Sequence, residues 1–238
     1  MRTKSDVREH TTRRRVLAGL AGGAVGALAL TSRAAPSRAG DVPPRDPVPA
    51  TPDEALAALR AGNRRFVDNQ PRVRSTEDIE HIWVDLATGQ APFATVLGCA
   101  DSRLAPEIIF DQFLGDIFVV REAGNIADSP TNLGSLEYAQ AALGAKLLLV
   151  FGHTSCGAVQ AAFEGKRPGG HIDAIVDVIA PGIAGASDVD DAVRRNVVAV
   201  QKRIREKSPL LREAESAGKM KIAGAVYDIR TGVVSFIE

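Results

Sequence analysis

Short apolar runs alternate with amphipathic stretches from about residue 51 to the end of the chain. The runs at 93–98, 117–120 and 146–151 have the length and composition of buried strands. Helical spacing of apolar residues covers 51–66, 75–86, 132–143 and 192–207. Strands that are apolar throughout and alternate with helices indicate an α/β domain, with a mostly parallel central sheet and helices on both faces.

The two ends of this region carry local signals of their own. Thr51, Pro52 and Glu54 form a helix start, with a cap, a proline in the first turn and a capping box. The stretches 222–229 and 233–237 read as strands joined by a turn at 230–232. Such a hairpin predicts that the last strand is an antiparallel edge strand.

The N-terminal segment has a different pattern. Residues 1–39 carry eight basic and two acidic residues, and an uncharged run from Val16 to Leu30 follows Arg13, Arg14 and Arg15. The run is too short for a comfortable bilayer span but suits a signal peptide. The paired arginines resemble the twin-arginine export signal, which carries folded proteins. The alternative is a basic tail in which the apolar residues are grouped by chance.

Three segments are therefore expected: a signal peptide at 1–39, a proline-rich linker at 40–50 and one domain at 51–238. The mature protein is expected in the periplasm, the cell envelope or outside the cell, without a stable membrane span. The whole chain has 29 basic and 29 acidic residues. A net charge of zero gives no indication of nucleic-acid binding.

The candidate chemistry follows two of the predicted strands. Cys99 and Asp101 come directly after the first strand, and His153 and Cys156 follow the third. Ligands of open α/β sheets bind beyond the carboxyl ends of the strands. Two cysteines and a histidine are zinc ligands, and a set of three leaves a fourth position for water or Asp101, as in catalytic sites.

Other interpretations of these residues remain open at this point. Cys99 and Cys156 could form a disulfide in an exported protein, or lie in the core as free thiols. Asp101 and Arg103 could be a plain surface ion pair.

The same segments resemble the β-class carbonic anhydrases. The resemblance lies in Cys99-Ala100-Asp101-Ser102-Arg103 and in Gly152-His153-Thr154-Ser155-Cys156-Gly157, with supporting runs at 62–66, 115–121, 123–125 and 134–139. It covers about residues 51–238, the whole of the predicted domain.

The resemblance implies roles for individual residues. Cys99, His153 and Cys156 match the zinc ligands, with one Zn²⁺ per chain. Asp101 and Arg103 match a dyad in which Asp101 either orients the zinc-bound water or, in a closed form, takes its place on the metal. Further matches form a substrate pocket that is completed across a dimer interface: Gln90, Phe118, Tyr138 and Gly157.

Three positions depart from the family pattern. Ala100 replaces the usual serine, and Glu122 replaces the usual asparagine. Val96 stands where members with a closed, bicarbonate-regulated site often have tryptophan, which favours the open form.

The implied activity is zinc-dependent hydration of carbon dioxide to bicarbonate and a proton, in a homodimer or a tetramer of dimers. Two alternatives are a hydrolase of carbonyl sulfide or carbon disulfide on the same fold, and a non-catalytic zinc-binding protein. The remaining histidines of the domain, His81 and His171, are expected at the surface.

Overall fold

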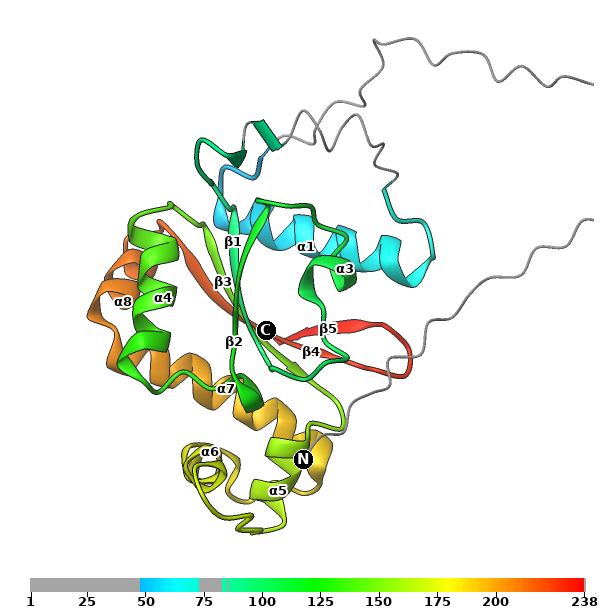
Figure 1. Cartoon of the computed structure of the whole chain (residues 1–238), viewed down its shortest axis with the longest axis vertical. Coiled ribbons are helices and arrows are strands. Elements are labelled where there is room, and N and C mark those ends of the chain that lie inside the picture. The colour runs from blue at the N-terminus through cyan, green and yellow to red at the C-terminus, as the bar shows by residue number, and fades with distance from the viewer. Residues whose placement is uncertain (1–47, 73–82, 85, 238) are drawn as a thin grey trace, which may run out of the picture. The chain divides into compact units, whose positions relative to one another are not determined.

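A five-stranded sheet forms the centre of the computed structural model, which describes residues 48–72, 83–84 and 86–237 (Figure 1). The strand order is β2-β1-β3-β4-β5. The first four are parallel, whereas β5 is antiparallel to β4. The mostly parallel sheet and its antiparallel edge strand were both predicted from the sequence. The strands are β1 (Ala94–Gly98), β2 (Ile117–Arg121), β3 (Leu147–His153), β4 (Lys221–Tyr227) and β5 (Val234–Ile237).

The two faces of the sheet pack against different helices. One face, with Val96 and Leu149, packs in a core with residues of α1 (Pro52–Val67). The other, with Leu97 and Leu148, packs against α4 (Pro130–Ala141), α7 (Val189–Lys207) and α8 (Pro209–Ser216). Figure 1 shows α1 and α4 on opposite sides of the strands. Because β1 and β3 are buried on both faces, their sequences are mostly apolar, with Thr95 and His153 as the polar exceptions.

The helix starts follow local capping chemistry. The Thr51 hydroxyl accepts from the Glu54 N–H at 3.2 Å, and the Glu54 carboxylate accepts from the Thr51 N–H at 3.3 Å, so the predicted capping box is confirmed. The helix expected at 132–143 begins two residues earlier, because Ser129 caps it and Pro130 occupies its first turn. The helix expected at 192–207 likewise begins at Val189, since Asp188 accepts from the Asp191 N–H.

Several short elements were not anticipated. Their bounds are α3 (Pro106–Ile109), α5 (Gly157–Phe163), α6 (Ile172–Ile179), α8, and the 3₁₀ turns η1 (Ala123–Asn125) and η2 (Ala180–Ile183). Two of them, η1 and α5, directly follow β2 and the loop after β3, and thus lie beside the candidate site.

Some of the predicted segments lie outside the described residues. These are the signal peptide, most of the linker, and most of the helix expected at 75–86, of which residues 83, 84 and 86 are helical. Within the described part of the chain, no helix is both long and apolar enough to cross a membrane.

Candidate metal centre

The pairing of β1 with β3 brings the two candidate segments together. Gly98 pairs with Phe151 in a parallel register, so Cys99 and His153 leave the sheet at the same edge. After His153 the chain turns sharply at Ser155, whose φ of 56° lies in the left-handed region. This turn directs Cys156 back towards Cys99.

Cys99, His153 and Cys156 form a compact buried cluster. Their candidate ligand atoms all lie within 4.8 Å of one another. Both cysteines are free thiols, with their sulfurs 4.0 Å apart, so the structure does not contain the disulfide considered from the sequence. Two thiolates on one tetrahedral zinc ion stand about 3.8 Å apart, given Zn–S bonds of about 2.3 Å. The observed spacing is close to that value.

Hydrogen bonding fixes which nitrogen of His153 faces the cluster. Its Nδ1 lies 2.9 Å from the Thr154 carbonyl oxygen, which can only accept, so Nδ1 carries the proton. The Nε2 atom is therefore a lone-pair acceptor, and it is buried without a hydrogen-bond partner. A buried polar atom without a partner is costly, and metal coordination at Nε2 removes that cost.

The Cys99 and Cys156 thiols shift each other's pKa through the hydrogen bond between them. The hydrogen bond with Cys156 is the main cause that lowers the pKa of Cys99 to about 4; burial opposes it, and His153 and the Gly124 N–H assist. The same hydrogen bond, with burial, raises the pKa of Cys156. The pair thus favours a thiolate at Cys99, the form of cysteine that binds metals.

Asp101 and Arg103 form a two-point ion pair beside the cluster. Arg103 Nε donates to Asp101 Oδ1 at 2.9 Å, and Nη2 donates to Oδ2 at 2.7 Å. The Arg103 Nη2 also donates to the Ser155 carbonyl at 3.2 Å, which links the dyad to the second turn. Asp101 Oδ2 lies 3.9 Å from His153 Nε2. The carboxylate is thus adjacent to the cluster but held by the arginine.

The ionisation of Asp101 follows from this arrangement. Hydrogen bonds from the Arg103 side chain hold the pKa of Asp101 well below its usual range, against a smaller opposing effect of burial.

The loop after β1, which carries Cys99 and Asp101, is held from the end of β2. There the Arg121 side chain donates to the carbonyl oxygens of Cys99, at 3.0 Å, and of Asp101.

The expected pocket residues do not join the cluster within one chain. Phe118 pairs with Thr95, four positions before Cys99 and about 13 Å away at the usual rise of a strand. The Tyr138 ring on α4 contacts Phe118 at a centroid separation of 6.3 Å. Gln90 is exposed in the loop before β1. Gly157, in contrast, follows Cys156 directly as the first residue of α5.

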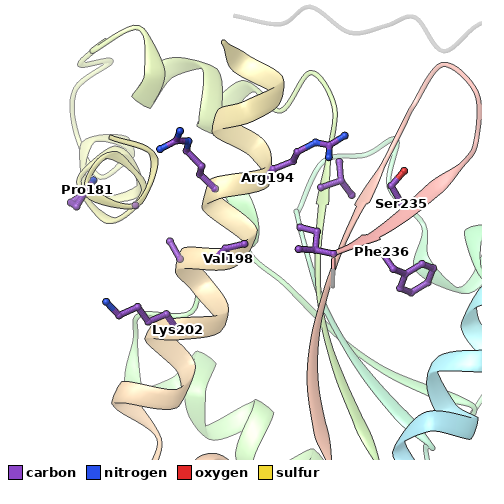
Figure 2. A pocket seen from close by; sticks show the side chains of 11 residues that line it. Pro181, Arg194, Val198, Lys202, Ser235 and Phe236 are labelled. Carbon is purple, nitrogen blue, oxygen red and sulfur yellow. The ribbon is translucent and has the colours of Figure 1, made fainter. Parts of the chain in front are cut away.

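A groove of about 780 Å³ lies elsewhere in the molecule, between α7 and β5 (Figure 2). Residues that line it include Pro181, Arg194, Val198, Lys202, Ser235 and Phe236. None of the cluster residues lines it, so this groove is separate from the candidate metal centre.

The three positions that depart from the family pattern lie outside the cluster, as does His171. Ala100 and Glu122 are exposed and Val96 is fully buried. His171 is exposed at the start of α6, as expected, whereas His81 lies outside the described residues. Two hydrogen bonds were missed from the sequence, because both donors lie on other elements: the Gly124 N–H donates to Cys99 Sγ, and Asn196 donates to the Gly124 carbonyl oxygen. The one sequence signal for Asn196 is that a polar residue interrupts the apolar stripe of the α7 helix.

The donor set fits zinc, since buried cysteine and neutral histidine are its common ligands and a set of three leaves a fourth position open. The fold and site together therefore define an α/β protein with a Cys₂His centre of the catalytic type, with a carboxylate beside it.

Known proteins agree with this class. The family model described as carbonic anhydrase matches residues 94–234. Carbonic anhydrase 2 of Mycobacterium tuberculosis is 42% identical over 190 residues, which is 76% of this chain and 90% of that protein. The chain belongs to the β-carbonic anhydrase family.

Solved structures agree in fold. The Coccomyxa β-carbonic anhydrase in complex with acetazolamide has a TM-score of 0.60 and 29% identity, over 76% of this chain and 86% of that one. A tetrameric β-carbonic anhydrase of Sordaria macrospora also has a TM-score of 0.60, with 25% identity over 76% and 96% of the two chains.

Proposed function

We propose that the protein catalyses the reversible, zinc-dependent hydration of carbon dioxide to bicarbonate and a proton. The observation that carries the proposal is the buried donor set of Cys99, His153 and Cys156, with Nε2 unpartnered and an ionised carboxylate 3.9 Å from it. Membership of the carbonic anhydrase family supports the same reaction.

The three side chains would hold the metal, and Asp101 would act on the reacting water. Bound zinc would supply the Lewis acidity that makes water a nucleophile near neutral pH, as in the carbonic anhydrases with three histidine ligands. Asp101 would accept a hydrogen bond from the attacking water and orient it towards the carbon of the substrate. Arg103 would keep Asp101 ionised and hold its carboxylate beside the cluster without letting it take a place on the metal, as a positioning residue.

The substrate pocket is proposed to form between two copies of the chain. Phe118 lies on β2, an edge strand of the sheet, and the Tyr138 side chain beside it is 51% exposed. A second copy placed against β2 would bring its Phe118 and Tyr138 beside Gln90 of the first copy. The aromatic rings suit a small apolar gas, and Gln90 can donate to an oxygen of bicarbonate. The tetrameric Sordaria relative shows that related chains assemble.

Stopped-flow measurement of carbon dioxide hydration on metal-assayed protein tests the proposal. We expect hydration with about one zinc per chain, and an unchanged rate in the His171→Ala variant, whose exposed histidine serves as control. Zinc-loaded protein that hydrates no carbon dioxide would contradict it. Turnover of carbonyl sulfide or carbon disulfide would then indicate a hydrolase, and no turnover of any of them a non-catalytic zinc protein.

We also propose export by the twin-arginine route, supported by the paired Arg13 and Arg14 before the apolar run of residues 16–30. Replacing both with lysine preserves the charge but should abolish delivery of mature protein to the cell envelope, as followed by cell fractionation. Arg33→Lys is the control. Normal delivery of the Arg13→Lys, Arg14→Lys variant would contradict the route.

A further inference from the structure

A buried asparagine on α7 is connected to the metal-binding thiol of Cys99 through one glycine. Asn196 is only 2% exposed, and its Nδ2 donates to the Gly124 carbonyl oxygen at 2.9 Å. The Gly124 N–H in turn donates to Cys99 Sγ at 3.3 Å. Both contacts are buried and join segments 72 and 25 residues apart in the chain. The result is a continuous connection from α7 to the sulfur.

Gly124 occupies a position that only glycine fits. Its φ is 71°, and a Cβ placed there would lie 2.6 Å from Ile179 Cδ1 on α6. The η1 turn is therefore pressed against α6 on one side and aims its N–H at Cys99 on the other. Asn196 holds the carbonyl of this left-handed residue from outside the turn, through the hydrogen bond from its Nδ2.

The helix that carries Asn196 is itself fixed against the strand of the second ligand. A Cβ at Gly152, the residue before His153, would lie 2.7 Å from Val197 Cγ2. Asn196 and Val197 are adjacent, so one short segment of α7 contacts both the η1 turn, which donates to Cys99, and the strand that carries His153. This close contact gives Asn196 a defined position relative to the two ligands.

We propose that Asn196 is a positioning residue for the Cys99 thiolate. By holding the Gly124 carbonyl, it keeps the Gly124 N–H directed at Sγ, where the N–H stabilises negative charge on sulfur and fixes the orientation of the thiolate for zinc. The inference rests on the zinc site of the proposed function but not on the identity of the substrate. It predicts that Asn196 controls how tightly zinc is held.

Two variants test this role. Asn196→Ala removes the donor, and Asn196→Asp keeps the shape but replaces the amide N–H donors by a carboxylate. The control is Asn63→Ala, because Asn63 is a similarly buried asparagine on α1 that donates to the carbonyls of Ile109, at 3.2 Å, and Gly232, at 2.9 Å. Loss of Asn63 thus costs buried hydrogen bonds without a link to the ligands.

The measurements are the zinc dissociation constant, by competition with a chromogenic chelator, and the sulfur-to-metal charge-transfer band of the cobalt-substituted protein. We expect the Asn196 variants to bind zinc about 10- to 100-fold more weakly, with a shifted band. The Asn63→Ala variant should lose stability to denaturant and keep the wild-type zinc affinity and band.

Wild-type zinc affinity and an unshifted cobalt band in the Asn196 variants would overturn the inference while leaving the proposed function intact. An equal loss of zinc affinity in Asn63→Ala would also overturn it, because the effect would then be one of general stability. A wild-type protein that binds no zinc would overturn both. Zinc binding without carbon dioxide hydration would contradict only the proposed function.

Discussion

Arg103 engages both carboxylate oxygens of Asp101, with donor–acceptor distances of 2.9 and 2.7 Å. This ion pair sets the orientation of the Asp101 carboxylate. While the arginine holds the carboxylate, the carboxylate is ionised and stands beside His153 Nε2 without pointing away into solvent. The first two predictions concern the separate roles of these two residues.

Asp101→Asn should retain zinc and lose most carbon dioxide hydration. The amide has the same volume, but it offers a weaker acceptor and presents a donor from one end. Loss of a positioned acid–base group typically costs about 10²- to 10⁴-fold. Stopped-flow rates, normalised to zinc content, measure the effect. Hydration at nearly the wild-type rate would show that Asp101 is not needed.

Arg103→Ala should also retain zinc and lose activity, but for a different structural reason. Without its partner, Asp101 is free to turn towards the metal position, and carboxylate is a good zinc ligand. A crystal structure of the zinc-loaded variant should show a carboxylate oxygen of Asp101 on the metal, a ligand that Asp101→Asn lacks. An Asp101 carboxylate that stays off the metal in Arg103→Ala would contradict this reading of the dyad.

Removal of zinc should lower stability. A ligand that binds only the folded state adds about 4 kcal/mol at a thousand times its dissociation constant. Denaturant unfolding should therefore shift to lower concentration after chelation and recover when zinc is restored. Cys156→Ser, which removes one of the three ligands, is the control and should respond little. An unfolding curve of the wild-type protein that does not change after chelation would contradict a bound metal.

The active form should be at least a dimer formed through β2. Phe118→Arg places a charge on this edge strand and should shift sedimentation towards monomer and reduce hydration. Val233→Arg, at an exposed position beside the opposite edge strand β5, should leave the dimer intact. Full activity in a monomeric wild-type protein would refute the shared pocket.

One ion pair outside the site should make stability depend on pH. Burial raises the pKa of Glu215, but the hydrogen bonds from Arg205 and the Ile222 N–H outweigh it, so the net shift is downward. A lowered folded-state pKa stabilises the fold above the ordinary glutamate pKa of 4.5, and this stabilisation is lost as the pH falls through the folded-state pKa.

Glu215→Gln should accordingly lower the unfolding free energy by about 1–2 kcal/mol near pH 7, after allowance for solvent screening. The difference from the wild type should diminish below about pH 4.5. Glu206→Gln, at an exposed glutamate with a 3.7 Å contact to Lys202, is the control. A difference that stays constant across this range would contradict the assignment.

The sheet could be predicted from the sequence because its central strands β1 and β3 are mostly apolar and buried on both faces. The ends of β1 and β3 then placed Cys99 and His153 at one edge, which located the candidate metal centre. Local signals such as Thr51 and Glu54 were sufficient for the first helix. Ser208 and Pro209 carry a similar signal for α8, which was overlooked.

Other features depend on contacts that no local pattern encodes. The short helices α5 and α6 lack a long periodic stretch; α5 packs against α6 and α7, and α6 packs against α5 and η2. The tautomer of His153 depends on a carbonyl fixed by its turn, and the connection from Asn196 to Cys99 spans three elements. Such relationships arise from the tertiary arrangement and became visible only in the structure.

The parallel pairing of β1 with β3 also determines when the metal centre can form. Between Cys99 and His153 the chain must complete the whole crossover through β2 and α4. In a zinc finger the ligands are neighbours in the chain, and the ion can nucleate folding. Here the ligands meet only after a long-range pairing step. Such a step is slow because the chain loses the entropy of loop closure before the paired strands gain their contacts. We therefore expect a metal to be acquired late in folding, after the apo chain has found its own topology.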